Sequence, residues 1–128
     1  MMKTFLILFH FSALCCVACQ KTIITRPVLT GKLIINGPCE HYVIQLEKGI
    51  IDTANIESSW FDSGNDSTYS NVFTVANYCS FGNYGLQKGD VFTFQIDLHS
   101  PPQECPICQI FVATPPKQNA VINLQKIN

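Results

Sequence analysis

The sequence predicts a small all-β domain, a five- to six-stranded barrel of the oligonucleotide/oligosaccharide-binding (OB-like) type, preceded by a signal peptide. Three observations favour this fold. Short β-rich segments recur along residues 29–128, and turn signals containing Gly, Pro and Asn separate them. Residues 91–98 alternate apolar and polar side chains, as a half-buried strand does. No stretch shows the helix–strand alternation of a parallel α/β fold.

The first two strands are expected at residues 29–36 and 41–47. Residues 29–36 are rich in branched aliphatic side chains, and Gly37-Pro38 ends this run. Residues 41–47 alternate, with one face formed by Tyr42, Ile44 and Leu46.

The middle of the chain is less regular. Residues 56–61 predict either a strand or one helical turn, and residues 62–70 predict a polar loop. A strand is expected at residues 71–77. Residues 79–89 contain three glycines and predict a long connection.

Three further segments complete the predicted sheet. A Lys-Gly-Asp turn introduces the amphipathic strand at residues 91–98, and a proline-rich loop covers residues 100–108. Residues 109–114 predict a strand that two prolines end, and residues 119–127 alternate as a last strand.

An immunoglobulin-like sandwich is the alternative fold. Cys39, Trp60 and Cys79 follow the Cys-Trp-Cys order of that family. However, the sandwich uses about seven strands, and about forty residues between the cysteines is a short spacing for it.

The amino-terminal residues have the layout of an export signal. Lys3 provides a positive charge, residues 5–17 are almost wholly apolar, and Ala18 precedes Cys19. The apolar stretch is shorter than the roughly 20 residues that a membrane span needs. We therefore expect a signal peptide at residues 1–18, a tether at 19–28 and one domain at 29–128.

Two processing routes remain open at Cys19. Residues 16–19 resemble a bacterial lipobox, which would place a lipid on Cys19 and make the membrane its partner. The lipobox pattern departs at Cys16, where leucine is usual. Ordinary signal cleavage would instead release a soluble, secreted protein.

Four cysteines remain in the body of the chain, and an even number in an exported domain predicts disulfides. Three pairings are compatible with the sequence. The close spacing of Cys105 and Cys108 favours a bond between them, which leaves Cys39 to pair with Cys79.

The run Cys105-Pro-Ile-Cys108 also resembles the active motif of thioredoxin-like oxidoreductases, so a thiol-redox protein is a further alternative. In those enzymes a helix follows the first cysteine and stabilises its thiolate. Here the following residues predict a strand, so we expect these cysteines to be structural.

The remaining side chains predict a non-enzymatic domain without cofactor or metal. The chain lacks the common nucleophile, metalloprotease and phosphate-loop motifs. Eight Lys or Arg residues against nine Asp or Glu residues argue against a nucleic-acid partner. Aromatic side chains near the loops are candidates to face a protein or carbohydrate partner: Trp60, Tyr69, Tyr78 and Tyr84.

The whole chain resembles the small uncharacterised exported lipoproteins of the Bacteroidetes group. The resemblance lies in the cysteine-ended signal, in residues 71–79 (NVFTVANYC) with 85–90, and in residues 105–108 with the later Thr114-Pro115-Pro116. It implies a cell-envelope location and a β-barrel, and it implies no catalytic residue. The expected function is a non-enzymatic cell-envelope lipoprotein domain with a binding or structural role. The alternative is a soluble, secreted, disulfide-stapled ligand-binding or inhibitor module.

Overall fold

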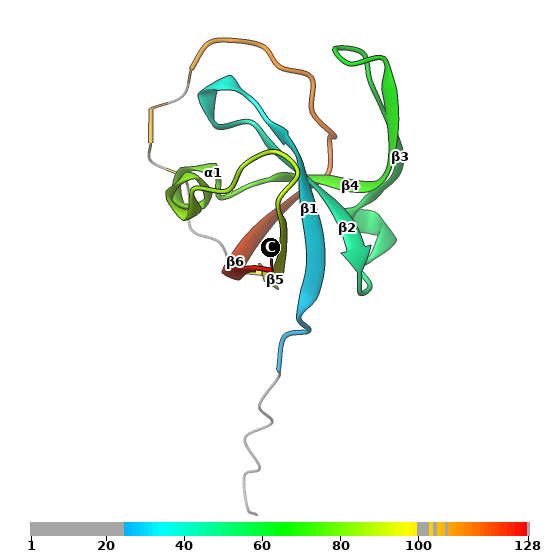
Figure 1. Ribbon diagram of the computed structural model, residues 1–128, viewed down its shortest axis with the longest axis vertical. Helices are drawn as coiled ribbons and strands as arrows, with labels where there is room; N and C mark the ends of the chain where they lie inside the picture. Colours follow the sequence, from blue (N-terminus) through cyan, green and yellow to red (C-terminus); the bar gives the residue numbers. More distant parts are fainter. Residues whose placement is uncertain (1–24, 100–102, 104, 107, 128) are drawn as a thin grey trace, which may run out of the picture.

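The computed structural model describes residues 25–99, 103, 105, 106 and 108–127, and sheet dominates this part of the chain (Figure 1). Its strands are β1 (Leu29–Asn36), β2 (Tyr42–Lys48), β3 (Glu57–Asp62), β4 (Ser67–Val75), β5 (Val91–Asp97) and β6 (Gln118–Lys126). Its short helices are η1 (Pro38–Glu40), η2 (Thr53–Asn55), α1 (Tyr78–Phe81) and η3 (Gly82–Tyr84).

Five of the strands close into one ring. β1 pairs antiparallel with β2 and with β5, and β5 pairs antiparallel with β6. β6 runs parallel to β4, and β4 pairs antiparallel with β2, which completes the circuit. β3 pairs with β4 and forms a hairpin that projects from the ring (Figure 1).

This closure confirms the predicted small all-β fold and agrees with its OB-like architecture. The immunoglobulin-like alternative is wrong, because a sandwich requires two separate sheets packed face to face.

Two apolar clusters stabilise the ring. The larger one is rich in phenylalanine, and its buried members are Leu29, Leu33, Ile44, Ile56, Phe73, Val75, Phe81, Leu86, Phe92, Phe94 and Val121. The smaller cluster contains Ile34, Val43 and Val72. Consecutive residues of β2 and β4 are therefore both buried, because the β3–β4 hairpin covers the second face of these strands.

The pairing of β1 with β2 is irregular. The register shifts between Thr30 and Gly31 and again between Leu33 and Ile35. Such bulges bend a strand and increase its twist. A Cβ atom on Gly31 would lie 2.7 Å from the Ile44 Cγ2 atom and 2.9 Å from the Phe94 Cε1 atom. Only glycine allows the strands to approach so closely here.

The polar loop expected at residues 62–70 is wrong. Those residues form a tight turn and the first half of β4, which begins at Ser67. The Asp62 carboxylate accepts hydrogen bonds from the Gly64 amide and the Asn65 side chain, and these bonds organise the turn. The alternative of a helical turn at residues 56–61 is also settled, because β3 occupies most of that segment.

The strand expected at residues 109–114 is wrong as well. We call residues 109–113 the strap, because this segment crosses one end of the molecule without joining the sheet (Figure 1). Its composition favours a strand, but every strand of the ring already has neighbours on both sides. The ring therefore offers the strap no free edge.

Candidate functional site

Two disulfides staple the loops at one end of the ring. Cys39 bonds to Cys108 across 69 residues of sequence, with Cα atoms 5.3 Å apart. Cys79 bonds to Cys105 across 26 residues, with Cα atoms 5.7 Å apart. All four cysteines form disulfides as predicted, but the expected pairing of Cys39 with Cys79 and of Cys105 with Cys108 is wrong. Sequence proximity favoured that pairing, whereas the fold brings each cysteine of the β5–β6 connection to a different element.

This pairing also removes the geometry on which the thiol-redox alternative depends, since Cys105 and Cys108 are not bonded to each other. Among the described residues, the Glu40 carboxylate lies near the staples, with one oxygen 3.1 Å from the Cys105 sulfur. Glu40, Cys79 and Cys105 place their ligand atoms within 4.8 Å of one another. Because both sulfurs are in a disulfide, they offer no thiolate to a metal ion.

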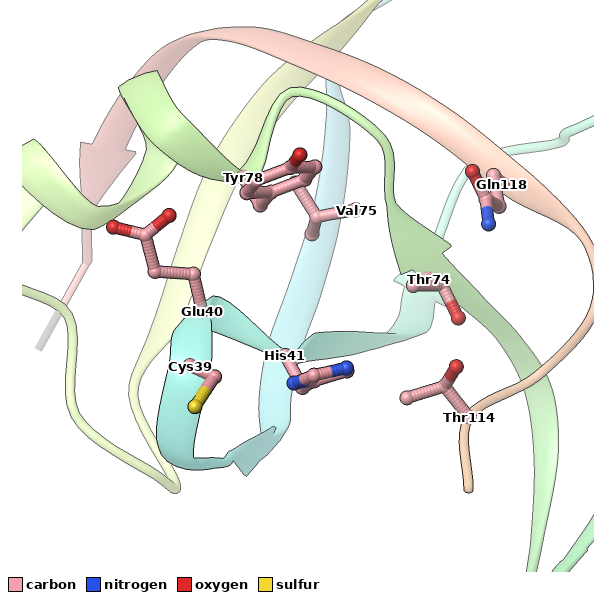
Figure 2. Close-up of a pocket in the computed structure, with 8 residues that line it drawn as sticks. All are labelled: Cys39, Glu40, His41, Thr74, Val75, Tyr78, Thr114 and Gln118. Atoms are coloured by element: carbon pink, nitrogen blue, oxygen red, sulfur yellow. The ribbon is translucent and has the colours of Figure 1, made fainter. Parts of the chain in front are cut away.

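A cavity of about 290 Å³ lies beside the staples (Figure 2). Four parts of the fold meet there: the β1–β2 loop, the end of β4 with α1, the segment that follows the strap, and the start of β6. The lining residues are Cys39, Glu40, His41, Thr74, Val75, Tyr78, Thr114 and Gln118.

The β1–β2 loop adopts a constrained backbone at this cavity. Cys39 has φ of 60° and Glu40 has φ of 62°, the left-handed region that side-chain-bearing residues rarely occupy. The Gly37 amide donates to the His41 carbonyl at 2.8 Å and closes the loop. Together with the Cys39–Cys108 bond, this hydrogen bond holds the conformation, and such strain is characteristic of functional loops.

The polar groups of the cavity fall into two sets. The Thr74 hydroxyl donates to the Pro115 carbonyl at 2.6 Å and so anchors the segment after the strap. His41 Nδ1 donates to the Pro38 carbonyl at 2.9 Å, which orients the imidazole toward Thr74 and Thr114 (Figure 2). Within the described residues, the side chains of Thr114 and Gln118 form no hydrogen bond. The cavity therefore offers imidazole, hydroxyl and amide groups to a ligand.

Glu40 lies near the Cys105 sulfur and also affects the pKa of Tyr42. Burial and, to a lesser extent, the charge of Glu40 raise the pKa of the Tyr42 phenol. The Tyr42 ring packs against Phe81 at 4.7 Å between centroids, so α1 is fixed to β2 at this end of the ring.

The predicted ligand-facing aromatics do not gather in one place. Trp60 and Tyr69 stack on each other at 6.3 Å and pack against the smaller apolar cluster. Tyr84 is 46% exposed on η3 and contacts Phe81. Only Tyr78 lines the cavity. Thr114 and Gln118 were not expected there, and no local signal could have indicated them, because tertiary contacts alone bring them to the loop end.

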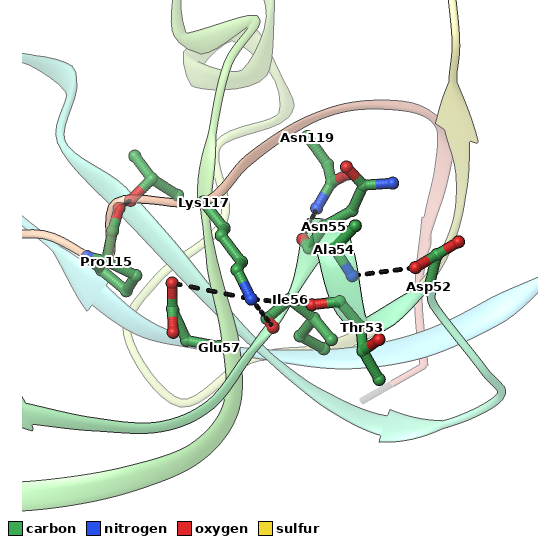
Figure 3. Close-up of polar contacts among 10 residues, drawn as sticks. Asp52, Thr53, Ala54, Asn55, Ile56, Glu57, Pro115, Lys117 and Asn119 are labelled. Carbon is green, nitrogen blue, oxygen red and sulfur yellow. Dashed lines mark hydrogen bonds and ion pairs between the residues drawn. The ribbon is translucent and has the colours of Figure 1, made fainter.

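A separate polar cluster positions the start of β6 (Figure 3). The Lys117 ammonium donates to the carbonyls of Thr53 and Ile56 at 2.7 and 3.0 Å, and Glu57 lies 3.9 Å away. The Asn119 amide donates to the Asn55 carbonyl at 2.7 Å. These interactions hold η2 against the start of β6, so the role of this cluster is structural.

The signal peptide and Cys19 lie outside the described residues, so their predicted roles stay predictions. Within the residues that are described, no helix has the length and apolar character that crossing a membrane requires. Comparison with protein-family models, with curated proteins and with solved structures found no match.

Proposed function

We propose that this chain is a non-enzymatic, exported binding module, held at the cell envelope through a lipid on Cys19, that captures a polar, hydroxyl-rich ligand such as a carbohydrate. The observation that carries the proposal is the Cys39–Cys108 bond, which joins the β1–β2 loop to the β5–β6 connection beside the cavity. In OB-type folds, loops at these positions bind oligonucleotides and oligosaccharides.

The disulfides support an extracytoplasmic location. Such bonds persist in oxidising compartments and are rare in the cytosol. The described part of the chain begins just before β1, at the end of the molecule opposite the strap (Figure 1). A tether at Cys19 would therefore leave the stapled loop end facing away from the membrane.

The cavity supports a small polar ligand. Its volume of about 290 Å³ is near the lower end of the roughly 300–1,000 Å³ that small-molecule pockets occupy. Its wall combines an aromatic ring, Tyr78, with hydrogen-bonding groups from His41, Thr114 and Gln118. Aromatic rings with neighbouring donors and acceptors suit the mixed apolar and hydroxyl faces of a sugar.

Two measurements test the proposal. The intact mass of the mature protein from its own host reports lipidation of Cys19, and an unlipidated mass would favour the soluble, secreted module instead. Saturation-transfer NMR with glucose, galactose, mannose and N-acetylglucosamine reports binding. We expect transfer that His41→Ala abolishes and that the matched control His99→Ala, an exposed histidine outside the cavity, retains. No transfer from the wild-type protein to any of the sugars would exclude a neutral monosaccharide ligand.

A further inference from the structure

The strap is an extended backbone whose polar groups have no partner among the described residues. Between Cys108 and Pro115 the chain shows no turn or bend. Among the described residues, none of the backbone amides or carbonyls of residues 109–113 forms a hydrogen bond. Backbone groups of this kind act as a template for another strand.

The side chains of the strap favour strand pairing. Its sequence, Gln-Ile-Phe-Val-Ala, has a β-branched and aromatic centre. Ile110 is 57% exposed and Phe111 is 92% exposed, which is unusual for side chains of this size. Beside them lies a cavity of about 440 Å³ formed by the strap, the β1–β2 loop and the β3–β4 turn.

Both ends of the strap are fixed, so a partner would meet a preformed strand. The Cys39–Cys108 bond holds one end. At the other end, Pro115 is buried and its carbonyl accepts the Thr74 hydroxyl. A segment that is already extended loses little further conformational entropy when it binds.

We infer that the strap pairs antiparallel with the strap of a second copy of this chain. In a two-fold antiparallel pair, any charged residue near the axis would face a like charge. Residues 108–116 contain no charged side chain, so two straps meet without repulsion. Pro115 and Pro116 lack amide donors and Cys108 is tied to the ring, so the ladder is short and closes as a dimer. This dimer does not depend on the proposed ligand.

Site-specific photo-crosslinking in the full chain, expressed in its own host, tests the inference. Benzoylphenylalanine replaces the exposed Gln109 at one end of the strap, and the matched control replaces Ile50, which is 89% exposed in the β2–η2 loop. We expect an adduct of twice the chain mass from position 109 and none from position 50. Peptide mass spectrometry identifies both halves of the adduct.

Two variants show whether the strap backbone makes the contact. Val112→Pro removes an amide that bonds to nothing in the described structure, and we expect the adduct to fall about tenfold or more because the loss occurs in both copies. Val112→Thr keeps the amide and retains the adduct. Phe111→Glu changes an exposed side chain, so we expect the fold to persist, and it places like charges across the two-fold axis, so we expect the adduct to fall.

Adducts with other proteins alone would overturn the second-copy inference, as would the absence of any adduct. A dimer adduct that survives both Val112→Pro and Phe111→Glu would also overturn it, because the copies would then associate through another surface.

Discussion

Removing the Cys39–Cys108 staple tests the disulfide arrangement most directly. The double variant Cys39→Ala/Cys108→Ala breaks one bridge and, in this structure, leaves Cys79 bonded to Cys105. The loop that Cys79–Cys105 closes lies inside the loop that Cys39–Cys108 closes, so the full length of the outer loop sets an upper bound on the contribution of the Cys39–Cys108 bridge.

The chain-entropy relation gives at most about 4.4 kcal/mol for the outer loop of 69 residues and about 3.5 kcal/mol for the inner loop of 26. Releasing Cys39 also lets the left-handed β1–β2 loop relax, which recovers about 1 kcal/mol. We therefore expect the free energy of unfolding to fall by about 3–4 kcal/mol, a drop in Tm of about 15 °C or more for a domain of this size.

Urea unfolding followed by the fluorescence of Trp60, the sole tryptophan, measures this loss. Thiol alkylation without reduction provides the second readout, and we expect neither Cys79 nor Cys105 to be alkylated in the double variant. The matched control, Cys79→Ala/Cys105→Ala, removes the other bridge and costs about 3.5 kcal/mol.

Free thiols at both Cys79 and Cys105 in the first variant would refute the reasoning, because they would show that Cys39 and Cys108 belong to different bridges. A peptide map of the wild-type protein in which Cys105 is linked to Cys108 would also refute the reasoning.

Three further perturbations follow from the structure. Phe81→Ala empties a site that is 1% exposed at the junction of α1 with the core, so urea unfolding is expected to show a loss of about 3–5 kcal/mol; a loss under about 1 kcal/mol would mean that α1 does not seal the ring. The raised pKa of Tyr42 makes its contribution complete below pH 10, the unperturbed phenol value, and progressively lost above it. Stability measured between pH 8 and 11 is therefore expected to fall less in Tyr42→Phe than in the wild type, and an equal fall would remove Tyr42 as the cause. Hydrogen bonding from the Gln87 amide and from Lys126 lowers the pKa of Asp90 below its usual 3.8, so its contribution is present above that pH and lost as the pH falls further. Asp90→Asn is expected to lower stability at pH 7 and to flatten its acid dependence, and an unchanged acid profile would contradict this.

Local patterns predicted several strands well. β1 occupies the expected residues 29–36, and β5 and β6 begin and end within a residue or so of the predicted strands. These segments carry their own periodicity and turn signals, so short-range sequence was sufficient. Residues 67–70 carried no apolar alternation, because that half of β4 lies in an exposed hairpin where polar side chains are tolerated.

The candidate site was less predictable. Tyr78 was identified as a ligand-facing aromatic and does line the cavity, but Trp60 and Tyr69 pack against the core instead. Aromatic content alone does not distinguish these roles, because both packing and binding favour large rings near loops.

The sequence by itself determined the small all-β class and the disulfide state of the four cysteines, because strand periodicity, turn residues and cysteine number are properties of short segments or of composition. It also leads us to expect export and a lipid on Cys19. Only the tertiary structure decided which cysteines pair, that five strands close into a ring, and that residues 109–113 stay outside it. The strap has the composition of a strand, but a strand exists only where a neighbour has an unpaired edge. Ring closure uses the edges of the five ring strands, and the long-range pairing of Cys39 with Cys108 holds the strap across the end of the molecule.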